Sequence, residues 1–460
     1  MRCIIGLSHH IRTFIPAMTI KSLPSGGGGV FWLGKGTFRA LRHRNYRIWF
    51  IGQTISLVGT WMQTMAQQVL VYRLTGSAAA LGVVSFVGLI PVIPLSFWAG
   101  SLADRYPKQK VVLFAQMGMM VQAVGLAVLT WLGIVQIWHV YLLSFLFGAL
   151  TAIDLPARQA FTVDLVEGKE DLTNAIGLNS AMFNLARALG PALAGMVVAA
   201  TGEAMAFSLN AITFLAVIGS LLLMRDLPDS SRPAAHRNGT LRHMVEGMRF
   251  VFSNRSIGVL ISLVAVSAFL SMPFNTLMPV FGGEILKESA GPVVAFFCDS
   301  PSGLFRCQAP EALPLGILLT TVGIGAVIAA LSVASLPASA RRGRWLTFGN
   351  LAFPALLIGF ALSRSFILSV LMMLGVGFCF VLQNALANTL LQIASPDDLR
   401  GRVMSFYTMT FQVTMRLGGL QAGLVADWLG APVSIGVGAV VSLLYGLFVA
   451  LRFPALREMK

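Results

Sequence analysis

The chain has 460 residues, of which 56% are hydrophobic and only 11% are charged. A water-soluble protein of this length needs about twice that charged fraction to cover its surface, so the composition excludes an ordinary soluble domain. The net charge of +15 falls in short loops between apolar runs rather than in one patch, and we therefore expect no nucleic-acid partner.

Twelve apolar runs follow one another along the chain, each long enough to cross a hydrocarbon core about 30 Å thick as an α-helix. Continuous runs of this kind exclude the alternating strands of a transmembrane barrel. The sequence therefore predicts an all-α membrane protein with twelve transmembrane helices. The predicted helices are residues 48–71, 81–103, 111–132, 138–161, 175–200, 204–224, 257–281, 313–336, 346–363, 367–393, 403–429 and 432–453.

The predicted helices form two sets of six, separated by a polar segment. Residues 1–37 read as a flexible cytoplasmic tail, and residues 38–224 form the first six-helix lobe. The segment 225–255 contains prolines and an Arg/His-rich run, which favours a cytoplasmic linker. Residues 256–460 form the second lobe, interrupted by an outward loop at about 282–312.

Lysine and arginine are concentrated in alternate connections between the helices. The opposite connections carry only Arg73, Lys287, Arg306 and Arg364. Because basic residues favour the cytoplasmic side, this asymmetry predicts a multi-pass inner-membrane protein with both termini in the cytoplasm.

Two cysteines, Cys298 and Cys307, fall within the predicted outward loop. In an oxidising compartment they can form a disulfide, and the alternative is a pair of free thiols. The other two cysteines are too far apart in the sequence for a metal site, and we expect no metal and no cofactor.

A short motif lies at the cytoplasmic end of the second predicted helix, in the run Gly-Ser-Leu-Ala-Asp-Arg-Tyr-Pro-Lys. It resembles the loop signature of the major facilitator superfamily, with Pro107 in place of a glycine. The resemblance implies a latch that holds the two lobes together on the cytoplasmic side. The residues that match are Gly100, Asp104, Arg105 and Lys108.

By that resemblance, Asp104 is expected to face the segment around Gly401, and Lys108 to face either Asp154 or Asp164. Ordinary anchoring by basic residues is the alternative to a latch. Five further stretches are similar to the enterobactin-exporter-like branch of the superfamily, described as transmembrane secretion effectors. They are residues 38–47, 59–63, 154–159, 184–191 and 398–405. Membership implies the major facilitator fold, with two lobes around a central cavity.

Charged residues inside predicted helices are the sharpest functional signals. Arg187 and Arg416 each lie within an apolar run, where an unpaired charge costs about 2.5–3.5 kcal/mol on insertion scales. Asp154 and Arg158 lie one turn apart and are expected to pair. These four residues therefore belong either to an internal ion-pair network or to the handling of substrate or protons.

Polar side chains recur on one face of several predicted helices. A lipid-facing helix gains nothing from such a stripe, so the stripes should line the central cavity or form polar contacts between helices. The cavity-lining candidates are Gln53, Thr60, Gln63, Gln67, Asn275, Asn384, Asn388 and Gln412.

The sequence thus predicts a secondary transporter rather than an enzyme. We expect a monomeric exporter of a small organic molecule, such as a siderophore-like compound or drug, working by alternating access and proton antiport. Asp154 is the leading proton carrier because no other acid lies so deep in a predicted helix. Residues 29–37 resemble a phosphate-binding loop but lack its Ser/Thr, and no ATPase domain follows. The alternatives are an uptake symporter and a non-transporting receptor or scaffold.

Overall fold

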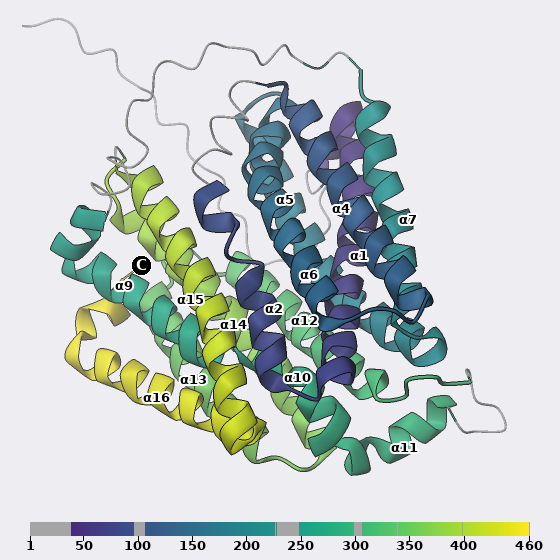
Figure 1. Ribbon diagram of the computed structural model, residues 1–460. Helices are drawn as coiled ribbons and strands as arrows, with labels where there is room; N and C mark the ends of the chain where they lie inside the picture. The colour runs from purple at the N-terminus through teal and green to yellow at the C-terminus, as the bar shows by residue number, and fades with distance from the viewer. Residues whose placement is uncertain are drawn as a thin grey trace, which may run out of the picture. The chain divides into compact units, whose positions relative to one another are not determined.

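The computed structural model describes residues 38–95, 106–225, 227, 248–298, 306–337, 339–397 and 399–459, and all regular elements within them are helices (Figure 1). The main helices of the N-terminal part are α1 (Arg44–Thr75), α2 (Ala78–Val87), α4 (Lys108–Trp131), α5 (Ile137–Asp164), α6 (Lys169–Thr201) and α7 (Glu203–Leu222). Those of the C-terminal part are α9 (Arg255–Val266), α10 (Phe274–Val280), α11 (Lys287–Cys298), α12 (Ala312–Ala334), α13 (Arg342–Leu362), α14 (Phe366–Ala394), α15 (Arg400–Leu429) and α16 (Ala431–Arg452). The short elements are η1 (Arg39–Arg42), η2 (Ser267–Ser271), η3 (Phe281–Ile285) and η4 (Pro454–Glu458).

Ten helical segments among the described residues are long and apolar enough to cross a membrane. They include Ala78–Leu95, which contains α2, and Arg255–Ile285, which combines α9 with α10. The helices α1 and α15 are also long enough to cross a membrane, at 32 and 30 residues, but their polar side chains leave them outside that set. Among the described residues, the twelve predicted runs lie largely on helical segments, and residues 96–103 of the second run lie outside the described part of the chain. Membrane crossing by α1 and α15 stays a prediction.

The turn between α1 and α2 shows how local sequence sets the helix ends. Gly76 adopts a φ of +60° and its N–H donates to the Tyr72 carbonyl, which closes α1 with the left-handed cap that glycine makes without strain. Ser77 then starts α2, because its Oγ accepts the N–H of Ala80 at 3.1 Å.

The segment Arg255–Ile285 is not a regular α-helix. Pro273 and Pro279 lack the N–H groups that α-helical bonding requires, and π-helical turns occupy η2 and η3 beside them. In these turns Met272 donates to the carbonyl of Ser267, and Leu286 donates to that of Phe281. The segment is therefore locally wider than an α-helix.

The helices of residues 38–459 belong to one compact unit that has two halves. The first half contains α1 to α7, in which α1 packs on α6 and α7, and α4 packs on α5 and α7. The second half contains α9 to α16, in which α14 packs on α12 and α13, and α16 packs on α13. The largest contacts between the halves join α2 to α15 and α6 to α12 (Figure 1).

Glycine allows the two halves to approach closely along both of these helix pairs. A Cβ at Gly82 of α2 would lie 2.6 Å from the carbonyl oxygen of Gly419 on α15. A Cβ at Gly316 of α12 would lie 2.7 Å from the Cα of Gly195 on α6. Both distances are too short for a real side chain, so the absence of side chains is what permits the contact.

The segment predicted as a loop at 282–312 is partly helical. Residues up to Ile285 continue the preceding segment as η3, and Lys287–Cys298 forms the 12-residue helix α11. A helix this short is far below membrane-spanning length, which is why hydropathy gave no sign of it. We call the end of the bundle near α11 the disulfide end, and the end where α1 begins the opposite end.

Candidate functional site

A cavity of about 240 Å³ lies between the two halves and is bordered by α1, α2, α5, α10 and α15. Four sequence-predicted residues line it: Thr60, Gln63, Gln67 and Arg416. Polar side chains that the sequence analysis did not select also line it, and these are Thr64, Gln68, Ser85, Ser144 and Thr276. The wall therefore combines hydroxyls, amides and one guanidinium with an apolar remainder.

The polar stripe of α1 serves both as cavity wall and as contact between helices. Gln63 donates to Gln122 of α4 at 2.9 Å and accepts from Asn210 of α7 at 2.6 Å. Gln67 donates to Ser144 of α5 at 2.8 Å. The sequence analysis gave cavity lining and helix–helix contact as alternatives, and Gln63 and Gln67 do both.

Gln122 and Asn210 were missed, although an amide within a largely apolar run is a usable signal. Gln53 lies on the same stripe as Gln63 and is equally buried, but it does not line the cavity among the residues described. Its Oε1 has no hydrogen-bond partner within the described part of the chain.

The cavity-lining candidates of the second half, Asn275, Asn384, Asn388 and Gln412, do not border this cavity among the residues that the structure describes. Asn384 donates to the Phe380 carbonyl of its own helix, and Asn388 accepts from Gln392 one turn later. Asn275 and Gln412 are partly buried. These residues do not join the cluster that surrounds Gln63.

Asp154 is completely buried and pairs within the first half. Its Oδ2 lies 2.6 Å from Nη2 of Arg158, one turn along α5, and its Oδ1 accepts from Gln116 of α4 at 3.0 Å. The sequence spacing had suggested this ion pair. The Asp154 carboxylate therefore contacts a cation of its own helix and an amide of the neighbouring helix α4.

Within the described part of the chain, Arg187 and Arg416 have no such partner. In the described residues, no carboxylate lies within ion-pair distance of either guanidinium. Arg187 lies over the ring of Phe380 at 4.9 Å and that of Trp61 at 5.9 Å. Arg416 lines the cavity and lies beside Gly88, where a Cβ would be 3.1 Å from its Nη1.

The structure describes only part of the latch signature. Gly100, Asp104 and Arg105 lie outside the described residues, so the expected approach of Asp104 to the segment around Gly401 is not described. Lys108 pairs with Asp164 through contacts of 2.8 and 3.0 Å. Of the two partners expected for Lys108, the structure therefore brings Asp164 to it.

The disulfide end is closed by polar contacts between the halves. Asp427 of α15 accepts from Ser77 Oγ and from the N–H of Ala78, both at 2.7 Å, and so caps the start of α2. Tyr72 of α1 donates to Glu284 of η3. The sequence analysis did not select Asp427, since its place near the end of a helix resembled that of an ordinary solvated acid.

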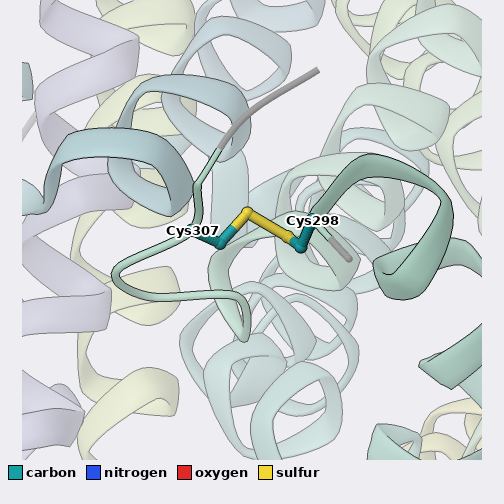
Figure 2. The surroundings of a disulfide bond; sticks show 2 residues. All are labelled: Cys298 and Cys307. Atoms are coloured by element: carbon teal, nitrogen blue, oxygen red, sulfur yellow. A yellow bond between two sulfur atoms is a disulfide. The ribbon is translucent and has the colours of Figure 1, made fainter. Parts of the chain in front are cut away.

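A disulfide joins Cys298, the last residue of α11, to Cys307 (Figure 2). The two residues after Cys307 contact the first half, because the N–H groups of Gln308 and Ala309 donate to the Ala199 carbonyl of α6 at 2.7 and 3.1 Å. The disulfide therefore holds a segment that links the two halves at this end.

A helical membrane bundle whose halves meet around a polar cavity is the build of a small-molecule transporter. The family model described as transmembrane secretion effector matches residues 35–293 and 305–460. The chain belongs to this family, a siderophore-exporter-like branch of the major facilitator superfamily. It is thus a multi-pass inner-membrane protein of a transporter family.

Characterised relatives share about a quarter of their residues with the chain. The staphyloferrin A transporter of Staphylococcus aureus is 25% identical over 389 residues, covering 84% of this chain and 90% of the relative. The enterobactin exporter EntS of Shigella boydii serotype 18 is 26% identical over 402 residues, covering 87% of this chain and 86% of the relative.

Solved structures show the same fold at lower identity. The nucleoside transporter NupG superposes with a TM-score of 0.62 at 14% identity, covering 91% of this chain and 100% of that chain. A bacterial homologue of the human lysosomal transporter Spinster, in an inward-facing and unoccupied conformation, gives 0.60 at 13%, covering 91% and 97%. At these identities the likeness concerns the fold alone.

Proposed function

We propose that the protein exports a small organic molecule, a siderophore-like compound or a drug, from the cytoplasm by alternating access. The observation that carries the proposal is the polar cavity between halves that are in close contact at the disulfide end. The names of the relatives support a siderophore-like cargo, because one is an enterobactin exporter and another is a staphyloferrin A transporter. We infer that the chain has no catalytic role.

We propose that α1 and α15 also cross the membrane, which makes twelve spans with both termini in the cytoplasm. Polar residues on a span are tolerated where they face a cavity or another helix, and both α1 and α15 border the cavity. The disulfide end would then face the oxidising outer side, where a disulfide persists. The lysine and arginine asymmetry supports the same orientation.

A proton gradient is the proposed energy source, with Asp154 as the proton carrier. Its carboxylate is buried between α4 and α5 and has two polar neighbours, Arg158 and Gln116. Protonation would release Arg158 from its ion pair, which links proton binding to a charge rearrangement inside the first half. The signature of Gly100, Asp104, Arg105 and Lys108 is the proposed latch on the cytoplasmic side, and the Lys108–Asp164 pair supports its attachment to α5.

The test is accumulation of a fluorescent siderophore conjugate in energised inverted vesicles, with and without a protonophore. Proton-driven export predicts protonophore-sensitive accumulation that vesicles lacking the protein do not show. Asp154→Asn should abolish the response to the gradient while the purified variant remains folded. Accumulation only in right-side-out vesicles would replace export by uptake symport, and folded protein that moves no solute in either orientation would favour a receptor or scaffold.

A further inference from the structure

The two arginines that have no carboxylate partner among the described residues lie at one depth in the bundle. Arg187 precedes the end of α6 by 14 residues, and Arg416 precedes the end of α15 by 13. At 1.5 Å per residue, both lie about 20 Å from the disulfide end. Both helices belong to the pairs that join the halves, α6 with α12 and α15 with α2.

Each arginine reaches from its own half to the other half. Arg187 belongs to the first half and lies over Phe380 of α14, in the second half. Arg416 belongs to the second half and lies beside Gly88, which follows α2 in the first half. Both guanidinium groups therefore lie where the halves meet, and of the two only Arg416 is among the described residues that line the cavity.

Nothing in the described residues neutralises these two charges. Asp154 is taken by Arg158, Glu203 is bonded to Arg73, and Asp427 caps α2. The rings around Arg187 stabilise a cation but carry no negative charge. Unpaired guanidinium groups at mid-membrane depth are costly, so a site of this kind is completed by an anion.

We propose that Arg187 and Arg416 form one anion-binding site shared between the halves, and that the cargo is an organic acid with at least two separated negative charges. This inference rests on the proposed transport function and names its substrate class. A dianion that contacts both guanidinium groups ties the halves together and removes the cost of enclosing two bare charges. An empty transporter lacks that neutralisation and closes less readily.

The experiment measures binding of two dyes with the same xanthene core to the purified full-length protein in lipid nanodiscs. Carboxyfluorescein is a polyanion at pH 8, and rhodamine 123 is a cation, so fluorescence polarisation compares charge at nearly constant shape. The wild type should bind the anionic dye more tightly than the cationic one. Arg187→Gln and Arg416→Gln should each weaken anionic-dye binding by about tenfold to a hundredfold, as expected for a hydrogen bond between charged groups.

The matched control is Arg364→Gln, which makes the same charge change at an exposed position near the start of α14 and should leave binding unchanged. The midpoint of thermal unfolding separates a binding role from a structural one. Loss of an unpaired charge should leave the midpoint of both arginine variants at or above that of the wild type, whereas a structural role predicts a lower midpoint. If a glutamine variant does not fold, Arg187→Lys or Arg416→Lys replaces it, and loss of the two-pronged contact should still weaken binding.

Equal affinity for the two dyes, or unchanged anionic-dye affinity in both arginine variants, overturns the shared anion site. Absence of anionic-dye binding by the wild type also overturns it. Transport in vesicles separates this outcome from the function itself. Export of cargo without any preference for anions would support the transporter proposal and rule out the anion site. Arginine-dependent dye binding without any transport would support the anion site and rule out the transporter proposal.

Discussion

Replacement of Asp427 by alanine is expected to open the disulfide end. The carboxylate accepts Ser77 Oγ and the Ala78 N–H at 2.7 Å, and the Ala79 N–H at 3.2 Å. Loss of a helix N-cap costs about 0.5–2 kcal/mol, and loss of the charge at the helix start costs about 0.3–1 kcal/mol. Because donor and acceptor belong to different halves, the combined cost of about 1–3 kcal/mol disfavours the arrangement in which the halves touch here.

The assay is the distance between spin labels placed across the contact, at Leu74→Cys and Trp428→Cys, in a background without Cys3. Both positions are exposed, at 37% and 87%, and Cys379 is buried. A cost of about 1–3 kcal/mol corresponds to a population shift of about fivefold to 150-fold toward longer distances.

The matched control is Asp397→Ala, since Asp397 is 90% exposed and pairs only with Arg400 at the opposite end in the described structure. It removes the same charge and should leave the distances unchanged. A distance distribution in Asp427→Ala that equals the wild type would show that the cap does not hold the halves together.

Three further perturbations test separate parts of the structure. Gly316→Ala should lower the midpoint of thermal unfolding, because its Cβ would clash with Gly195 at a cost of about 1–3 kcal/mol. The control Gly219→Ala should leave the midpoint unchanged, because no atom lies within 4 Å of its Cβ. Equal midpoints for the two variants would contradict the close packing of Gly316 on Gly195. Asp104→Asn should cripple transport without preventing membrane insertion, and normal transport by the folded variant would remove the latch. Cys298→Ser should speed hydrogen exchange of the Gln308 and Ala309 amides that bond to α6, because the disulfide that closes this short loop stabilises it by about 2–3 kcal/mol. Unchanged exchange would show that the segment stays on α6 without the disulfide.

Hydropathy and local spacing predict those features that one helix determines alone. The apolar runs locate the helices, and the four-residue spacing of Asp154 and Arg158 gives their ion pair. The proton-carrier role of Asp154 remains a prediction. The resemblance to the superfamily suggests two partners for Lys108, and only the packing of α4 against α5 brings Asp164 to it.

Features that depend on the rotation of one helix against another are not predictable from a single sequence. The stripe of α1 contains both Gln53 and Gln63, yet only Gln63 borders the cavity among the described residues. Ser85 and Ser144 face the cavity without any periodic pattern to mark them. Asp427 acts as a cap only because α15 ends beside the start of α2.

The measurement that tests the central claim most directly uses purified protein in sealed liposomes with an imposed pH gradient and the fluorescent siderophore conjugate outside. Proton antiport predicts uptake when the interior is acidic, no uptake when the gradient is reversed or absent, and loss of the gradient dependence in Asp154→Asn. Uptake that follows an alkaline interior, or that ignores the gradient in the wild type, would contradict proton-driven export.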